Sequence, residues 1–416
     1  MNQYKETVLK RAEDLREQLS SICRTIHENP ELGFEEYKSS RLLTDFLEAQ
    51  GFQVTRGCGG LDTAFRAKLT GNGKSNETGQ NGHIRQNGRA TGTGHSPVIG
   101  ILCEYDALPG IGHACGHNII AAASVGAAAA AASVLKDFDG TIVVLGTPSE
   151  EGSGGGKQIL WDKGVMDDID LAMMFHPGPQ TVIRDKTLAI QALRFTFHGQ
   201  SAHGGAAQEK GRNAVEAVIQ TFNGINSLRG HLKKDVNIHG IITKGGTATN
   251  IIPDLGEAEF GVRASTMEEL ADVVERVSCC AKGAALMTGC TVDITHLGVA
   301  YADLITNETL LGLMESNLEA LNIPIDVREA PAALASTDVG NLSHHIPAIQ
   351  CMIGIGSKAL PHTKEFAAAC AGEAGVKIAM NAARALACTV VDLLESPELV
   401  KKAQEELEER KKHVRF

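Results

Sequence analysis

Short apolar segments that alternate with helical stretches constrain the fold of this 416-residue chain more than any other feature. Three of them, PVIGILC (97–103), TIVVLG (141–146) and LAMMF (171–175), are strand candidates with apolar residues throughout. Helical stretches at 117–137 and 154–163 separate them. Strands that are apolar on both faces and alternate with helices indicate a mostly parallel sheet flanked by helices.

A different order of strand and helix candidates in the middle of the chain predicts a second domain. Strand, helix, two strands, helix and strand candidates follow one another there, which is the β-α-β-β-α-β order of a ferredoxin-like unit. The first pattern then resumes with a strand candidate at 347–353 and a helix candidate at 364–394. We therefore expect an α/β domain in two parts, 1–187 and 303–416, with a smaller α+β domain inserted at 188–302.

The N-terminal part carries two further helix candidates, at 4–28 and 35–50, where apolar residues recur at helical spacing. Gly51 follows the second of them, as a C-terminal cap does. The stretch 71–96 is rich in Gly, Asn and Thr and almost free of apolar residues. It predicts a long exposed hairpin loop or mobile insertion.

Composition excludes several classes of partner. The net charge of -11 and the 4% of aromatic residues argue against nucleic acid, which needs a basic face and stacking platforms. The apolar run 119–135 is dominated by Ala and Gly, so a buried helix is expected there rather than a membrane span. The N-terminus has no secretory signal, and the ten cysteines lack a disulfide-like spacing, so we expect reduced thiols in the cytoplasm.

Acids, histidines and a cysteine follow each apolar strand candidate directly. EYDALPGIGHACGHN follows 97–103, TPSEEG follows 141–146, HPGP follows 171–175, and GIGSKALPHTKEF follows 347–353. Open parallel sheets bind ligands beyond the carboxyl ends of their strands. The sequence therefore predicts that these metal-binding residue types converge at one edge of the sheet.

Cys115 and His117 form a Cys-x-His pair in a Gly-containing loop before a helix candidate. Such a pair can place a thiolate and an imidazole on neighbouring metal ions, and a helix N-terminus favours the deprotonated thiol. Taken alone, the pair is also compatible with chance or core packing. His113 and Asp106 nearby make the functional interpretation stronger.

Glu150 and Glu151 are adjacent carboxylates in a Gly-rich turn after an apolar strand candidate. They could be solvated surface charges, or one could bind metal while the other carries the proton of attacking water. His176 and His362 could each be a structural histidine. Considered together, the candidate ligands favour a site for two metal ions.

On these motifs the chain resembles peptidase family M20, which includes aminoacylases, carboxypeptidases and dipeptidases. It is most similar to the amidohydrolase branch and, within it, to the aminoacylase-1-like dipeptidase group. Asn118 after the second His of EYDALPGIGHACGHN, and the segment ASTDVGNLS (335–343), carry that closer similarity. The resemblance spans nearly the whole chain and implies a zinc-exopeptidase-like sheet with an inserted lid and dimerisation domain.

The resemblance also implies roles for individual residues. Cys115 would bridge two divalent metal ions, preferably zinc, with manganese or cobalt as alternatives. The remaining ligands would be His117, Glu151, His176 and His362. Glu150 would be the general base and then the general acid. Asp106 would orient a ligand, although the residue could equally belong to the turn before Leu108-Pro109.

The inserted domain resembles the family's lid at HGQSAHGG (198–205), which singles out His203 as a residue that polarises the scissile carbonyl across a homodimer. Asn250 and Arg263 would hold a substrate carboxylate. From the residues alone, these three could be a surface-loop His, a turn-capping Asn and a solvent-facing Arg. The family's Pro shortly after the lid His is missing here, and 71–96 is longer than the usual hairpin.

We therefore expect a metal-dependent hydrolase of an amide or peptide bond, acting on a small substrate such as a dipeptide with a basic C-terminal residue. An N-acyl amino acid or a pathway-specific amide is the alternative substrate. From other classes, a non-catalytic binding protein that kept the fold would lack a ligand or the base, and none is missing. A purely structural zinc protein is disfavoured, because such sites are closed and Cys-rich.

Overall fold

The computed structural model describes residues 2–73, 96–331 and 335–412, which form two compact units. The larger unit takes in the described residues within 1–186, 304–333 and 338–414. The smaller unit takes in those within 187–303 and 334–337. The predicted loop at 71–96 falls almost entirely outside the described residues.

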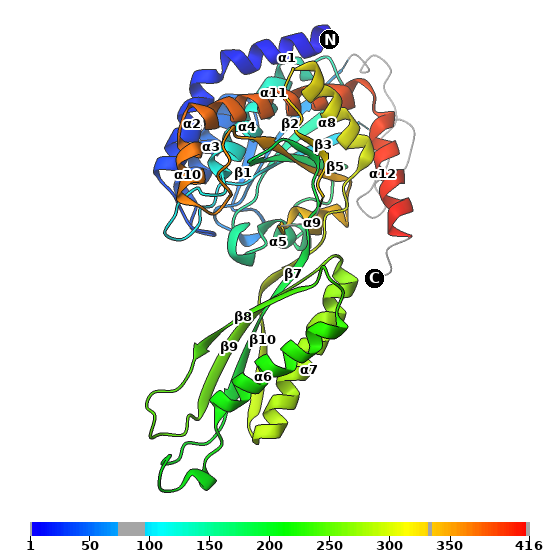
Figure 1. The fold of residues 1–416 in the computed structure, drawn as a ribbon. Helices are drawn as coiled ribbons and strands as arrows, with labels where there is room; N and C mark the ends of the chain where they lie inside the picture. Colours follow the sequence, from blue (N-terminus) through cyan, green and yellow to red (C-terminus); the bar gives the residue numbers. More distant parts are fainter. Residues whose placement is uncertain (1, 74–95, 332–334, 413–416) are drawn as a thin grey trace. The chain divides into compact units, whose positions relative to one another are not determined.

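In the larger unit, helices surround the strands (Figure 1). These strands form one eight-stranded sheet with the order β1-β2-β4-β3-β5-β12-β6-β11. Its strands are β1 (Gln53–Arg56), β2 (Phe65–Gly71), β3 (Val98–Cys103), β4 (Gly140–Gly146), β5 (Leu171–Gly178), β6 (Val182–Arg184), β11 (Val327–Glu329) and β12 (Ala348–Gly354). The central strands β4, β3, β5 and β12 are parallel, whereas β2 runs antiparallel to β4 and β1 antiparallel to β2. Every residue of β3 and β4 is buried, so both faces of these strands are covered, as their continuous apolar character predicts.

Ten α-helices of the larger unit lie in the described ranges. They are α1 (Gln3–Asp14), α2 (Arg16–Glu28), α3 (Tyr37–Ala49), α4 (His117–Leu135), α5 (Gly156–Asp162), α8 (Glu308–Ala320), α9 (Val339–Ser343), α10 (Lys364–Ala371), α11 (Glu373–Glu395) and α12 (Glu398–Lys411). Two predicted helices are each divided. The helix expected at 4–28 is interrupted at Leu15, and the one expected at 364–394 is broken at Gly372, whose backbone is extended (φ -93°, ψ -171°).

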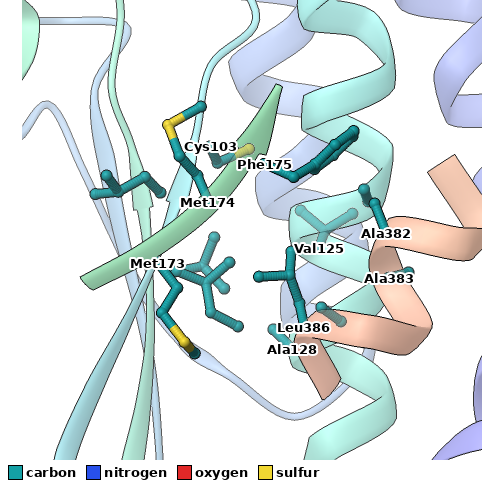
Figure 2. Packing of buried hydrophobic residues seen from close by; sticks show 14 of the residues in the cluster. Cys103, Val125, Ala128, Met173, Met174, Phe175, Ala382, Ala383 and Leu386 are labelled. Carbon is teal, nitrogen blue, oxygen red and sulfur yellow. The ribbon is translucent and has the colours of Figure 1, made fainter. Parts of the chain in front are cut away.

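Helix α4 is the central helix of the core. Its side chains meet those of α11 beside β5, among them Val125, Ala383 and Phe175 (Figure 2). A Cβ placed on Gly126 would come within 2.6 Å of Leu19 Cδ1, so the small residues of α4 allow α2 to approach closely. By length and composition α4 and α11 could each cross a membrane, but 89% and 78% of their apolar windows are buried inside the protein. The prediction of a buried helix over 119–135 is confirmed.

The smaller unit has the predicted β-α-β-β-α-β order. Its elements are β7 (Ala189–His198), α6 (Ala214–Leu228), β8 (Asn237–Lys244), β9 (Leu255–Ala264), α7 (Met267–Thr288) and β10 (Thr291–Tyr301). The antiparallel sheet has the order β10-β7-β9-β8, and α6 and α7 share its hydrophobic core. Alternate residues of β7 are buried, as expected for strands covered by helices on one face. The predicted fold class, a mostly parallel sheet flanked by helices plus a ferredoxin-like unit, is confirmed.

Candidate metal centre

The candidate ligands of the larger unit are brought to one edge of the sheet by its parallel strands. Asp106 follows β3, and Glu150 with Glu151 follows β4. His176 lies within β5, near its carboxyl end, and His362 lies in the segment between β12 and α10. Because β4, β3, β5 and β12 are neighbours, the segments that follow them meet at the same edge.

Gly116 shapes the loop that presents Cys115 and His117. It precedes α4 with φ of 83°, a conformation that favours glycine. A Cβ at this position would lie 2.5 Å from Pro177 Cγ, so only glycine lets the loop pack against the end of β5. As a result, Cys115 Sγ lies 3.4 Å from His176 Nε2.

Two groups of three possible metal ligands share Cys115. One group is Cys115, His117 and His176, and the other is Cys115, Glu151 and His362. Within each group, one ligand atom from every residue lies within 4.8 Å of the others. The structure thus brings together all five residues that the sequence singled out as ligands.

Asp106 holds both groups in place. His117 Nδ1 lies 2.9 Å from Asp106 Oδ1 and 3.1 Å from the Asp106 carbonyl oxygen. Both neighbours are acceptors, so Nδ1 carries a proton, and in the neutral ring Nε2 keeps its lone pair. Asp106 Oδ2 also accepts the Glu151 backbone N–H at 2.9 Å. A carboxylate that fixes the tautomer of a histidine in this way is common behind metal-binding imidazoles.

The donor set and its unpaired atoms fit metal ions. Within the described part of the chain, His117 Nε2 and Glu151 Oε1 are buried and have no hydrogen-bond partner. A buried polar atom without a partner is costly, and a metal ion would satisfy both atoms. A thiol, imidazoles and a carboxylate are the ligands that zinc takes in proteins.

Burial, with a contribution from Glu151, raises the pKa of the Cys115 thiol well above its ordinary value. Without a metal ion, desolvation therefore outweighs any stabilisation of the thiolate by the N-terminus of the following helix. Coordination to a metal ion would have to displace this proton.

Glu150 and Glu151 are adjacent, but their surroundings move their pKa values in opposite directions. Burial, together with Glu104 and Glu151, raises the pKa of Glu150 well above its usual range. Burial also acts to raise the pKa of Glu151, but His362 and His117 outweigh it and lower the value. Two carboxyl groups whose pKa values are driven apart can divide the work of carrying a proton and binding a cation.

Sequence reasoning missed Glu36, which fixes the turn before Glu150. Its carboxylate accepts the Ser149 backbone N–H at 2.9 Å and the Thr63 hydroxyl at 2.7 Å. Burial raises the pKa of Glu36 to about 7. Ser149 itself has φ of 56°, a left-handed conformation that is rare for serine. The spacing of Glu36 from Glu150 gives no sequence signal for this contact.

A buried group of charges, also missed, lies beside the candidate ligands. Lys157 Nζ donates to Glu104 Oε1 at 2.5 Å and to Asp338, and all three side chains are fully buried. Glu104 and Asp338 stand inside the motifs EYDALPGIGHACGHN and ASTDVGNLS, which the sequence did single out. Lys157, in contrast, follows a run of glycines with no motif to mark it.

His203 lies exposed in a turn of the smaller unit. Its Nδ1 accepts the backbone N–H groups of Gly205 and Ala206, both at 3.1 Å. The Gly204 N–H donates to the Asn250 carbonyl at 2.8 Å, so the loops carrying His203 and Asn250 lie side by side. Both residues are exposed.

Arg263 lies on β9 of the same unit and is half-buried. Its Nη1 donates to Ser336 Oγ at 2.8 Å, which gives the guanidinium a structural partner. Burial lowers the pKa of Arg263. The described contacts assign no substrate role to His203, Asn250 or Arg263, and their roles remain predictions.

Comparison with known proteins places this geometry in a family. The model of peptidase family M20/M25/M40 matches residues 100–385. The Xaa-Arg dipeptidase of Mus musculus is 33% identical over 97% of this chain and 91% of its own length. One of the two subunits of the p-aminobenzoyl-glutamate hydrolase of Escherichia coli K12 is 32% identical over 80% of this chain and 70% of its own length.

A solved structure has the same fold. The YXEP protein of Bacillus subtilis, described as a dinuclear metal-binding peptidase, superposes with a TM-score of 0.68 at 20% identity. The comparison covers 92% of this chain and 99% of that one.

Proposed function

The chain belongs to peptidase family M20/M25/M40, which makes it a metal-dependent hydrolase of peptide or amide bonds, and we propose that its substrates are dipeptides with a basic C-terminal residue. The similarity to an Xaa-Arg dipeptidase along almost the whole chain supports this substrate class. The pair of ligand groups that share Cys115 is the observation that carries the proposed chemistry.

We propose that the site holds two divalent metal ions, with zinc preferred and manganese or cobalt as alternatives. Cys115, His117 and His176 would hold one ion, and Cys115, Glu151 and His362 the other. Bound there, the ions would lower the pKa of water and polarise the scissile carbonyl.

Glu150 is the proposed proton carrier. It stands next to a ligand, its pKa is raised, and its side chain is 11% exposed, so solvent can reach it. As carboxylate it would take the proton of the attacking water, and as acid it would deliver that proton to the leaving amine. Asp106 would keep the His117 ring in one tautomer throughout.

His203 is the proposed donor to the carbonyl oxygen. Because Nδ1 accepts two backbone N–H groups, the neutral ring carries its proton on Nε2 and can donate from there. Such a donor stabilises the charge that develops on the oxygen in the transition state. Asn250 and Arg263 are the proposed binding residues for the substrate carboxylate.

We also propose that the protein is a cytoplasmic homodimer that joins through the smaller unit. Strand β8 is at the edge of its sheet, and all of its residues except Ile238 are exposed. Ile241 and Ile242 are 62% and 48% exposed, and an unpaired apolar edge favours pairing with a second copy. All ten cysteines are free, which supports a reducing compartment.

A substrate panel tests the substrate class. Metal-free protein would be loaded with zinc, manganese or cobalt and assayed on dipeptides ending in Arg, Lys, Ala or Asp, with N-acyl amino acids alongside. We expect hydrolysis of the basic dipeptides, with kcat/KM higher than for the others. Preference for N-acyl amino acids would favour the alternative, an amidohydrolase, which the similarity to aminobenzoyl-glutamate hydrolase supports.

A further inference from the structure

Glu104 occupies a position at the proposed metal centre that neither ligand group uses. It follows β3 directly, two residues before Asp106, and its side chain is fully buried. Its Oε1 accepts from Lys157 Nζ at 2.5 Å. Its Oε2 lies 3.4 Å from His117 Nε2 and has no hydrogen-bond partner among the described residues.

The two atoms that face each other here are both unsatisfied. In the neutral ring, which a metal ligand must be, His117 Nε2 has no proton to donate to Glu104, because the one proton is on Nδ1, where the Asp106 side chain and carbonyl accept it. The lone pair of the neutral ring and the carboxylate oxygen 3.4 Å away repel one another unless a cation lies between or beside them. A metal ion that contacts both atoms would satisfy the lone pair and the carboxylate oxygen at once.

Lys157 does not supply that charge, because its ammonium group contacts the other oxygen of Glu104. Carboxylate oxygens of Glu104, Glu150 and Asp338 lie within 4.8 Å of one another, a cluster that resembles a separate cation site. Lys157 already donates to both Glu104 and Asp338 in this cluster, so its cation is an ammonium. Asp338 uses its second oxygen to accept the Lys157 backbone N–H at 3.0 Å.

We propose that Glu104 gives the metal centre one more carboxylate oxygen, Oε2, on the side of His117, while Lys157, which also donates to Asp338, holds its other oxygen. Glu104 thereby completes the group formed by Cys115, His117 and His176 with a fourth protein atom. The proposal rests on the proposed metal centre.

Glu104→Gln and Asp338→Asn form a matched pair for testing this role. Each variant removes one negative charge and leaves Lys157 one carboxylate partner. In Glu104→Gln the amide oxygen could still accept from Lys157, but the second terminal atom would belong to an NH₂ group, which cannot bind a metal ion. Asp338 has no oxygen left to offer a metal, since both accept hydrogen bonds from Lys157.

The experiment measures zinc binding to the full chain. Metal-free parent and variants would be titrated with Zn²⁺ against a chromophoric chelator, with the bound metal counted by mass spectrometry. We expect Glu104→Gln to bind one of the two ions at least about 10- to 100-fold more weakly, since loss of even a supporting carboxylate behind a ligand has an effect of this size. Asp338→Asn should stay close to the parent.

Equal losses in both variants, or none in Glu104→Gln, would overturn the proposal, because general charge or structure would then explain the result. A parent that bound no divalent ion would overturn the proposed function as well, so the two failures are distinguishable. Thermal unfolding without metal checks folding. If Glu104→Gln does not fold, Glu104→Asp replaces it in the same titration. This variant keeps the charge, but its carboxylate is one methylene shorter. Zinc affinity equal to the parent's would then overturn the proposal.

Discussion

The charged residues at the edge of the larger sheet and those on the loops of the smaller unit satisfy their polar atoms in opposite ways. His117 is fully buried, and its Nε2 has no hydrogen-bond partner within the described ranges. His203 is exposed, and its Nδ1 is occupied by two backbone N–H groups of its own turn. The buried site therefore has polar atoms that a bound ligand would satisfy, whereas the hydrogen bonds of the exposed loop are made within the loop itself.

Because of this difference, unpaired polar atoms indicate a ligand in the buried region but not in the exposed one. A buried, unpaired polar atom carries a free-energy cost, so its presence indicates a ligand. An exposed side chain that meets water carries no such cost, and its geometry is equally compatible with a purely structural role. Substitutions in the two regions should therefore have different signatures, in metal binding for the first and in turnover or assembly for the second.

The largest effect is expected from Glu150→Gln. Glutamine fills the same volume but cannot take a proton, so kcat should fall roughly 10³-fold, within the range for loss of a general base. Glu150 lies within 4.8 Å of His117 and Glu151 but belongs to neither group that shares Cys115, and as the proposed proton carrier it is not a ligand, so metal content should stay at the parent's level. Steady-state kinetics with metal analysis of the same sample measures both.

Glu151→Gln is the matched comparison for that variant, since it removes the neighbouring carboxylate. It should lose metal as well as activity. Near-parental turnover in Glu150→Gln, or loss of metal equal to that of Glu151→Gln, would contradict the division of roles between the two residues.

The next effect concerns His203 and separates its two ring nitrogens. Asparagine can place an acceptor near the position of Nδ1 and keep the turn, but it lacks a donor at the position of Nε2. Glutamine does the reverse. If Nε2 donates to the carbonyl oxygen, His203→Asn should lower kcat roughly 10²-fold, the usual effect of losing one such donor.

His203→Gln should then retain more activity than His203→Asn, with metal content unchanged in both. The opposite order would show that the turn made with Gly205 and Ala206 is what matters, and that the role of His203 is structural.

Much of the fold could be predicted, because its signals are local. Strands β3, β4 and β5 are continuous apolar runs, and β7 alternates buried and half-buried residues. Helix α12 was missed although its buried Val400, Ala403 and Leu407 recur at helical spacing, because dense charge surrounds them and obscures the pattern. Short strands such as β6 and β11 depend on pairing with distant segments and carry no such signal.

The site could be predicted only where a residue of a metal-binding type lies at the end of an apolar strand or in the segment that follows it. Cys115, Glu151 and His176 satisfy both conditions. Lys157 contradicts the general rule that lysine is exposed, and only its contacts with Glu104 and Asp338, from segments far apart in the chain, make its burial possible. That pairing is a property of the tertiary structure, which no spacing in the sequence reveals.

Asp106→Asn should have a smaller effect on the buried site than Glu150→Gln. The amide can keep one of the contacts to the His117 ring and the Glu151 N–H, but not both in their present form. Affinity for zinc should fall about 10- to 100-fold, as for other carboxylates behind a metal-binding histidine. Asp168→Asn is the control, because Asp168 pairs with Arg66 away from the candidate ligands. An unchanged zinc affinity in Asp106→Asn would limit this residue to the turn before Leu108.

The smallest effect is expected from Ile241→Lys on strand β8, the edge at which a second copy of the chain would pair. If β8 pairs with its counterpart, a charge at Ile241 would be buried in the contact, and the dimer dissociation constant should rise about tenfold or more, which corresponds to roughly 1.4 kcal/mol. Leu286→Lys is the control, because Leu286 is 85% exposed on α7 rather than on the edge strand. Light scattering over a dilution series measures both variants. A dimer that Ile241→Lys leaves intact and Leu286→Lys weakens would place the contact on α7. A parent that is monomeric at every concentration would contradict the proposed homodimer.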